Sequence, residues 1–306
     1  MPAGDALEER IAAWRGSGEA SPVPVVIAGS VTRDLVHRQG RTTAQIGGTV
    51  WYAGLTLSRL GFPVRAVTRL AAGDSEIAAA LAEAGIEARI APSKATTVFH
   101  NIYGGGGRDD RRQVVEAVAA AIAGDALAAA VEPGGLCYLG PLHPDDLSAE
   151  AVAVAAGLEA TPVAVDVQGY TRRIVEDRVE AALAPGLAEV LNFADVVKAG
   201  AGEACLIAGA ATPADAAVRL AEGRETTEVL VTDGARGVHL AIGGKIHRQP
   251  APALADVDPT GAGDIFLAAY LAGRLIGEPP ESALRLAVEH AAGRLADPTG
   301  RRRLAV

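Results

Sequence analysis

The chain has 306 residues, of which 49% are hydrophobic and only 4% aromatic, so it can bury a large core of small aliphatic side chains. This composition favours an α/β fold over an all-β sandwich. The net charge of −9 at pH 7 argues against a nucleic-acid partner, since the one basic cluster is the three arginines at 301–303.

Cysteine usage and hydropathy point to a cytoplasmic protein without a membrane partner. Cys137 and Cys205 are far apart, and neither has the spacing of a zinc site, so we expect two buried free thiols in a reducing compartment. The first residues are amphipathic and charged, without the apolar segment of a signal peptide. No apolar run reaches the roughly 20 residues that a spanning helix needs.

The first half of the chain mixes a buried strand with short alternating strands. Residues 1–22 are expected to be an extension outside the main fold, with a short amphipathic helix and a polar linker. A buried strand at 24–28 ends at Gly29 and Ser30, and the glycines at 47 and 48 lead into a helix over 50–60. A further strand is predicted at 64–69 and a helix at 75–84. Short alternating strands at 43–46, 86–90 and 96–103 predict a small sheet with one exposed face.

The second half alternates regularly between strands and helices. Residues 104–112 are four glycines followed by charged residues, and they predict a solvated loop. Strands are predicted at 136–139, 163–167, 195–198, 228–232 and 238–242, and helices at 148–158, 174–183, 203–208 and 213–221. This alternation is typical of a parallel sheet with right-handed crossovers, and ligands bind such sheets at the carboxyl ends of the strands.

A glycine-rich turn directly before an apolar helix is the strongest chemical signal. It reads Asp-Pro-Thr-Gly-Ala-Gly-Asp over 258–264. Backbone N–H groups of Gly261, Ala262 and Gly263 at the start of a helix can hold an anionic oxygen. Asp264 could then accept the proton of an attacking hydroxyl. The structural alternative is a tight turn with a capping aspartate.

Four stretches together resemble the ribokinase-like, or PfkB, carbohydrate kinase family. The turn at 258–264 looks like the family's C-terminal signature, and Gly47 with Gly48 looks like its N-terminal one. Asp34 resembles the aspartate that binds substrate hydroxyls, and residues 231–237 resemble the nucleotide-binding turn. The resemblance implies a Rossmann-like ribokinase fold over 23–306, a mostly parallel sheet flanked by helices, with a small β lid from 41–48 and 86–113. Residues 163–168 and 197–204 look most like the inositol kinase branch.

The resemblance also implies a set of site residues for ATP, Mg²⁺ and a small sugar or polyol. Asp264 would be the general base, and Glu203 would reach Mg²⁺ through water. The substrate side would comprise Asp34, Gly47, Gly48, Gln168 and Arg172, and the nucleotide side Lys198, Thr232, Gly234, Gly237 and His290. For Lys198 and His290 an ordinary surface position is the alternative. The family's asparagine three residues before Glu203 is Gly200 here, which affects metal placement.

These features predict an ATP-dependent kinase that phosphorylates a hydroxyl of a sugar or inositol-like polyol. A nucleoside kinase of the same fold is an alternative, and so is a catalytically weak regulator that binds sugar or nucleotide. A dehydrogenase is excluded because no GxGxxG follows the first strand. The resemblance implies that the lid could serve as a homodimer interface, and the sequence leaves the oligomeric state open.

Overall fold

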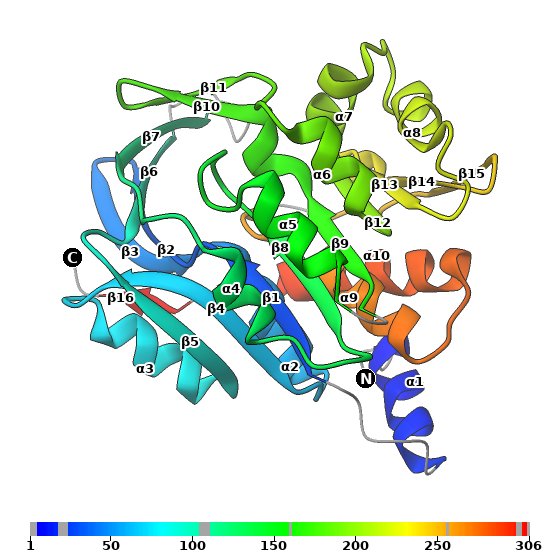
Figure 1. The fold of residues 1–306 in the computed structure, drawn as a ribbon, viewed down its shortest axis with the longest axis horizontal. Helices are drawn as coiled ribbons and strands as arrows, with labels where there is room; N and C mark the ends of the chain where they lie inside the picture. Colours follow the sequence, from blue (N-terminus) through cyan, green and yellow to red (C-terminus); the bar gives the residue numbers. More distant parts are fainter. Residues whose placement is uncertain are drawn as a thin grey trace.

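Two sheets organise the computed structural model, which describes residues 5–17, 24–103, 111–158, 161–254, 257–297 and 302–304 (Figure 1). In this part of the chain the larger sheet has nine strands. Seven neighbouring strands, from β5 at one edge to β13, run parallel to one another. The last two strands at the other edge, β14 and β15, pair antiparallel. In spatial order they are β15 (Lys245–Gln249), β14 (Val238–Ile242), β13 (Glu228–Thr232), β12 (Val196–Gly200), β9 (Val163–Asp166), β8 (Leu136–Gly140), β1 (Val25–Gly29), β4 (Val64–Ala71) and β5 (Ile86–Ser93).

Helices cover both faces of the larger sheet, as predicted for an α/β fold. Along β1, Val25 and Ile27 face one core while Val26 and Ala28 face the other. One core is covered by α1 (Ala6–Gly16), α2 (Thr49–Arg59), α3 (Ser75–Glu83), α9 (Ala262–Leu275) and α10 (Pro280–Ala296). The other is covered by α4 (Gly124–Ala128), α5 (Ala149–Ala156), α6 (Leu187–Phe193), α7 (Ala201–Ala208) and α8 (Pro213–Ala221). Both faces are therefore buried, and the strands are correspondingly apolar.

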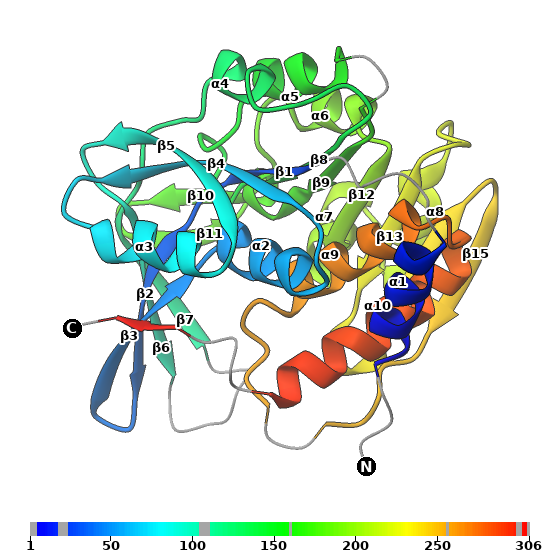
Figure 2. The same cartoon turned by 90° about the horizontal axis from the view of Figure 1, so that it is seen from below.

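The smaller sheet stands out from the larger one and forms the lid (Figure 2). It is mostly antiparallel, and only β2 and β6 run parallel. In spatial order its strands are β10 (Arg172–Val175), β11 (Arg178–Ala181), β7 (Arg111–Ala117), β6 (Thr97–Tyr103), β2 (Thr32–Arg38), β3 (Arg41–Gly47) and β16 (Arg303–Leu304). Because β1 runs almost directly into β2, the lid starts at the carboxyl end of a central strand.

Three expectations about the lid and its neighbours were wrong. Residues 86–93 form β5, which pairs with β4 at the edge of the larger sheet instead of joining the lid. Residues 174–183 are largely a hairpin of β10 and β11, because Ile174 and Val179 pack against Phe99 with the period of a strand. Residues 111–117 form β7, although the rest of the predicted loop at 104–110 lies outside the described residues.

The N-terminal helix is part of the main fold, which corrects the expected boundary after residue 22. Leu7 and Ile11 of α1 are 0% and 2% exposed and belong to the same core as α9 and α10. Asp5 caps the helix by accepting from the Leu7 N–H at 3.0 Å. The short amphipathic pattern was read correctly as a helix, but its apolar side chains find their partners far along the chain.

Within the described residues, no single helix is long and apolar enough to cross a membrane. Helices α7 and α8 pass that length and composition test only as a pair, and they meet at 55°.

Candidate active site

A cleft of about 540 Å³ lies where the lid meets the carboxyl ends of the parallel strands. Its walls come from several elements that are distant in sequence. The lid contributes Thr32, Asp34, Phe99, Asn101, Tyr103, Gln113 and Arg172, and the larger sheet and its loops contribute Leu142, Asp166, Gln168, Lys198, Gly200, Glu203 and Thr232. The remaining wall is formed by Gly48, Tyr52 and residues 259–264.

The glycine-rich turn begins helix α9 at the cleft. Gly261 is the N-cap, with φ 80°, and a Cβ there would lie 2.5 Å from the ring of Tyr52, so only glycine fits. The Ala262 N–H donates to the Pro259 carbonyl at 3.0 Å, so it is already engaged. Gly263 and Asp264 follow in the first turn, where backbone N–H groups have no partner inside the helix. An anion at this turn would therefore meet the Gly263 and Asp264 amides of the first turn of α9, because the Ala262 amide is already engaged.

Asp264 lies in an electrostatic environment that favours its protonated form. Burial and the charge of Asp166 raise its pKa from 3.8 to about 6, against the opposing effects of Lys198, Thr49 and Tyr138. The Tyr138 hydroxyl donates to Asp264 Oδ1 at 3.4 Å. Tyr138 is fully buried, and its own pKa is raised well above 10 by burial and by the charge of Asp264. A carboxyl group with a pKa near neutrality suits general-base catalysis.

A buried ion pair lies beside Asp264. Lys198 Nζ on β12 donates to Asp166 Oδ2 on β9 at 2.8 Å, and the two residues are 5% and 3% exposed. Burial lowers the pKa of Lys198, but the charges of Asp166 and Glu203 more than offset this, so the net pKa is raised. Lys198 therefore remains a cation and partly neutralises the carboxylates around it.

Glu203 has a structural role as well as a place in the cleft. Its Oε2 accepts from the Gly200 N–H at 2.7 Å and so caps helix α7. Three carboxyl groups, Glu203, Asp166 and Asp264, surround the single ammonium group of Lys198. Among the described residues these three carboxyl groups do not lie close enough together to form a ready-made metal site. A single carboxylate could still hold Mg²⁺ through water, because this ion takes one or two carboxylates and keeps several waters. One oxygen of Glu203 accepts a hydrogen bond, whereas both oxygens of Asp166 do, from Lys198 and from the Gln168 N–H.

Asp34 on the lid lines the same cleft as the glycine-rich turn at 258–264. Asp34 is 6% exposed, and its Oδ1 accepts from the Thr32 hydroxyl at 2.7 Å. Gly47 on the neighbouring strand leaves room for the carboxylate, because a Cβ at that position would overlap Asp34 Oδ2. Gly48 lines the cleft, whereas Gly47 is not among its lining residues in the described part of the chain. Of the predicted substrate segment, Asp34 and Gly48 therefore line the cleft, and Gly47 only leaves room for the Asp34 carboxylate.

The other predicted residues divide into two groups. Gln168 and Arg172 line the cleft next to Asp166, and Thr232 lines it at the end of β13. Gly234 and Gly237 do not belong to the cleft lining in the described residues, and they form a turn next to it. At Gly237 a Cβ would overlap the Gln249 carbonyl, so this turn packs against β15.

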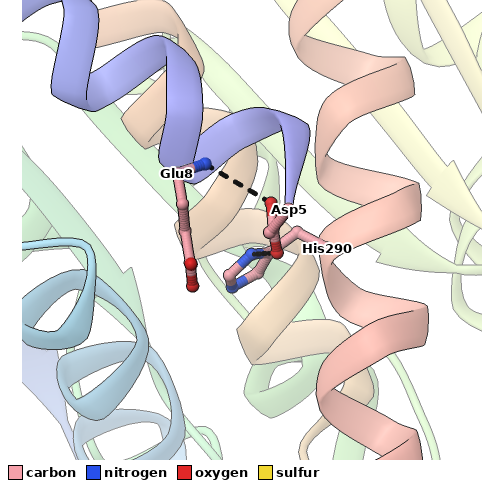
Figure 3. Close-up of side chains that lie close together, drawn as sticks. All are labelled: Asp5, Glu8 and His290. Carbon is pink, nitrogen blue, oxygen red and sulfur yellow. Dashed lines mark hydrogen bonds and ion pairs between the residues drawn. The ribbon is translucent and has the colours of Figure 1, made fainter. Parts of the chain in front are cut away.

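His290 does not lie at the cleft, which corrects the expectation that it approaches a nucleotide. Its side chain is buried under α1, and Nδ1 is 2.5 Å from Asp5 Oδ2 (Figure 3). Glu8 is the third member of this group. The physical reason is that the apolar face of α1 covers this part of α10, so the histidine anchors the N-terminal helix.

Several cleft residues were not anticipated from the sequence. Tyr138 lies in the middle of a buried strand, and nothing in its local pattern marks it as a partner of Asp264. Asn101 and Gln113 come from two strands of the lid, and no local pattern in the sequence marks either of them as a cleft residue. The cleft as a whole can hold an anionic phosphate at α9, hydroxyls at Asp34 and a proton acceptor between them.

Curated relatives match parts of the chain. A cytidine kinase from Thermococcus kodakarensis is 37% identical over 108 residues, covering 34% of this chain and 38% of the relative. An inositol 3-kinase from Zea mays is 52% identical over 60 residues, covering 18% of this chain and 16% of the relative. The aligned regions thus span well under half the length of these relatives.

Solved structures and a family model match most of the chain. A pyrophosphate-dependent kinase in the ribokinase family, complexed with a pyrophosphate analogue and myo-inositol, has a TM-score of 0.80 at 20% identity and covers 90% of this chain and 96% of its own. Arabidopsis thaliana ribokinase, complexed with ribose and ATP, has a TM-score of 0.71 at 21% identity over 91% and 94%. These likenesses confirm the predicted ribokinase fold. The family model of the pfkB carbohydrate kinases matches residues 25–298, and the chain therefore belongs to the pfkB family of carbohydrate kinases.

Proposed function

We propose that the protein phosphorylates a hydroxyl of a cyclic, inositol-like polyol, with Asp264 as the general base. The observation that carries this proposal is that Asp264, at the first turn of α9, and Asp34, on the lid, line one cleft. A carboxylate on the lid can accept hydrogen bonds from two substrate hydroxyls. The helix start can hold the transferred phosphoryl group.

In the proposed reaction, the substrate hydroxyl oxygen attacks the terminal phosphorus of the donor. A new oxygen–phosphorus bond forms, and the bond from phosphorus to the bridging oxygen of the donor breaks. The hydroxyl proton passes to Asp264, and the electron pair of the broken bond stays on the leaving phosphate. The Gly263 amide and the Lys198 ammonium group would stabilise the negative charge. General-base assistance of this kind contributes roughly 10² to 10⁴-fold in rate.

We propose ATP with Mg²⁺ as the donor. Glu203 would hold the ion through water, and the bound ion would neutralise charge on the donor phosphates. Inorganic pyrophosphate is the second candidate donor, for two reasons. The kinase with a TM-score of 0.80 was complexed with a pyrophosphate analogue. In addition, the turn that contains Gly234 and Gly237, which was expected to contact a nucleotide, is not part of the cleft lining within the described residues.

The nature of the acceptor is supported by the inositol 3-kinase match and by the polar lid face. A nucleoside acceptor is the alternative that the cytidine kinase match favours. Both reactions would use the same base, so the choice depends on the part of the cleft under the lid.

A matrix of donors and acceptors tests the proposal. ATP and pyrophosphate would each be combined with myo-inositol, fructose, ribose and cytidine, and phosphorylated product would be quantified by mass spectrometry. We expect myo-inositol to give the highest kcat/KM, and Asp264→Asn to lower kcat/KM by about 10² to 10⁴-fold with every acceptor. Asp125→Asn is the matched control, because Asp125 is exposed on α4. Binding of these ligands without any product would instead support a regulator, and cytidine as the best acceptor would support a nucleoside kinase.

A further inference from the structure

A second cavity, of about 400 Å³, lies where the N-terminal helix meets the ends of α2 and α10. Its lining consists of aliphatic side chains and four charged residues, Glu8, Arg15, Arg59 and Arg294. Arg15 is in the last turn of α1, Arg59 is the last residue of α2, and Arg294 is in the last turn of α10. Three guanidinium groups from three separate helices therefore line one cavity, in a chain whose net charge is −9.

Positive charge outweighs negative charge in the lining of this arginine cavity. Within the described residues, Glu8 is the one carboxylate of the lining, and Asp297, which is not part of the lining, lies 3.6 Å from Arg294. Burial and the charge of Arg294 lower the pKa of the Arg59 guanidinium below its ordinary value, against the opposing charge of Asp297. Folding thus brings like charges together, and a bound anion would offset their repulsion.

Arg15 is held in place by neutral groups. Its Nη2 donates to the Leu60 carbonyl at 3.2 Å, and its guanidinium carbon lies 5.9 Å from the centre of the Phe62 ring. Gly61 leaves space for the guanidinium group, because a Cβ at that position would overlap Arg15 Nη1. Within the described residues Arg15 has no ion-pair partner, so its charge and most of its five N–H donors are available to a ligand.

The helix dipole gives a simpler reason for an arginine at each of these positions. The dipole favours a cation at the carboxyl end of a helix, and it acts on each helix separately. It does not require three such ends to meet, nor their guanidinium groups to line a common space. A guanidinium group matches the oxygens of a phosphate group through paired N–H donors, so three of them around one cavity suit a ligand that carries phosphate.

We propose that the arginine cavity binds a small anion that carries a phosphate group, either as free phosphate or as a phosphate ester. The bound phosphate would join α1 to α2 and α10 and would hold the N-terminal helix on the main fold. Within the described residues the arginine cavity and the catalytic cleft have no lining residue in common. Binding here therefore does not depend on the proposed phosphoryl transfer.

Affinity and location can be measured without turnover. Inorganic phosphate and glycerol 3-phosphate would be titrated separately against the full chain by ³¹P NMR, at an ionic strength held constant with sodium acetate. A phosphate could also bind at the start of α9, so hydrogen exchange of backbone amides would locate each binding event. We expect phosphate to protect amides of α1, within residues 6–16, in addition to any effect at 261–264. The tighter of the two ligands would show whether the cavity prefers free phosphate or an ester.

Two substitutions in the lining should change the affinity in opposite directions. Arg15→Gln removes a charged donor and should weaken phosphate binding at α1 by about 10 to 100-fold. Arg15→Lys keeps the charge without the paired donors and should lie between Arg15→Gln and the wild type. Glu8→Gln removes the carboxylate of the lining and should tighten binding by about two to five-fold.

Arg285→Gln is the matched control for the loss of an arginine. Arg285 is also on α10, where it pairs with Glu289 at 3.3 Å, and it is not part of the cavity lining within the described residues. This variant should bind phosphate like the wild type. Arg15 is exposed, so its substitution should leave the fold intact, and thermal melting of each variant without ligand checks this.

The outcomes separate this site from the catalytic cleft. Protection of α1 that is lost in Arg15→Gln and kept in Arg285→Gln would support the proposal. Absence of protection in α1 of the wild-type protein would overturn it, as would equal affinities in these two variants or weaker binding in Glu8→Gln. A wild-type protein that phosphorylates none of the acceptors would contradict the proposed function and would leave these binding results standing.

Discussion

Replacing Asp264 by asparagine removes the proposed base but keeps the size of the side chain. In the wild-type protein the pKa of this carboxyl is raised to about 6, because burial and Asp166 outweigh the stabilising neighbours. The base must be ionised, so kcat/KM should rise about tenfold per pH unit up to about pH 6 and then level off. We expect Asp264→Asn to lower kcat/KM by about 10² to 10⁴-fold and to abolish this acid limb.

The same substitution should stabilise the fold at alkaline pH. The folded-state pKa lies above the ordinary value of 3.8, so the folded protein prefers the protonated carboxyl. The stabilisation that this preference provides is complete below about pH 4 and is lost as the pH rises through about 6. A shift of about two units corresponds to roughly 3 kcal/mol, at 1.36 kcal/mol per unit. Because part of Asp264 faces the cleft, this figure is an upper limit.

Two measurements check this reasoning. Urea unfolding of both proteins should show that Asp264→Asn is more stable at about pH 8, by up to roughly 3 kcal/mol, and that the difference shrinks toward about pH 4. The pH profile of kcat/KM reports the pKa of the free enzyme. A variant that keeps more than a tenth of wild-type activity, or a stability difference that grows as the pH falls, would refute the role and the electrostatics given to Asp264.

Three further substitutions address the surroundings of the site. Tyr138→Phe removes a hydrogen-bond donor that lowers the pKa of Asp264, so the acid limb of the kcat/KM profile should move to higher pH by up to about one unit. An acid limb at the wild-type pH would show that this hydrogen bond does not affect the pKa of Asp264. Lys198→Met removes the ion-pair partner of the buried Asp166 carboxylate and should lower the unfolding free energy by about 3 to 5 kcal/mol. The double variant Lys198→Met with Asp166→Asn should lose clearly less. Equal losses in the two variants would argue against a stabilising Lys198–Asp166 ion pair. His290→Gln should lower the unfolding free energy by about 1.5 to 3 kcal/mol through the lost contact with Asp5, with kcat and both KM values unchanged; a raised KM for ATP would instead restore a role for His290 in nucleotide binding.

The elements of the fold were predicted best where their signals are local. The turn at 258–264 was predicted to start a helix, and α9 does begin at Ala262, because glycine and the capping geometry depend on neighbouring residues. The helix predicted at 213–221 coincides with α8, which has a threonine cap and a proline in its first turn. The hairpin of β10 and β11 was missed because a short segment with a few apolar residues among charged ones can satisfy either a helical or a strand period.

The sequence by itself determined the family, the parallel sheet, and the position of Asp264 in the first turn of a helix. These follow from short-range chemistry: glycines at a turn, a helix start, and apolar strands that end in polar residues. Only the tertiary structure decided which groups meet. Tyr138 reaches Asp264 across 126 residues, and Asp5 reaches His290 across 285. The sheet to which β5 belongs and the pairing of Asn101 with Gln113 were decided in the same way. Such partners depend on strand register and helix packing, which bring distant segments together. Neither of the two segments carries a sequence pattern that identifies the other.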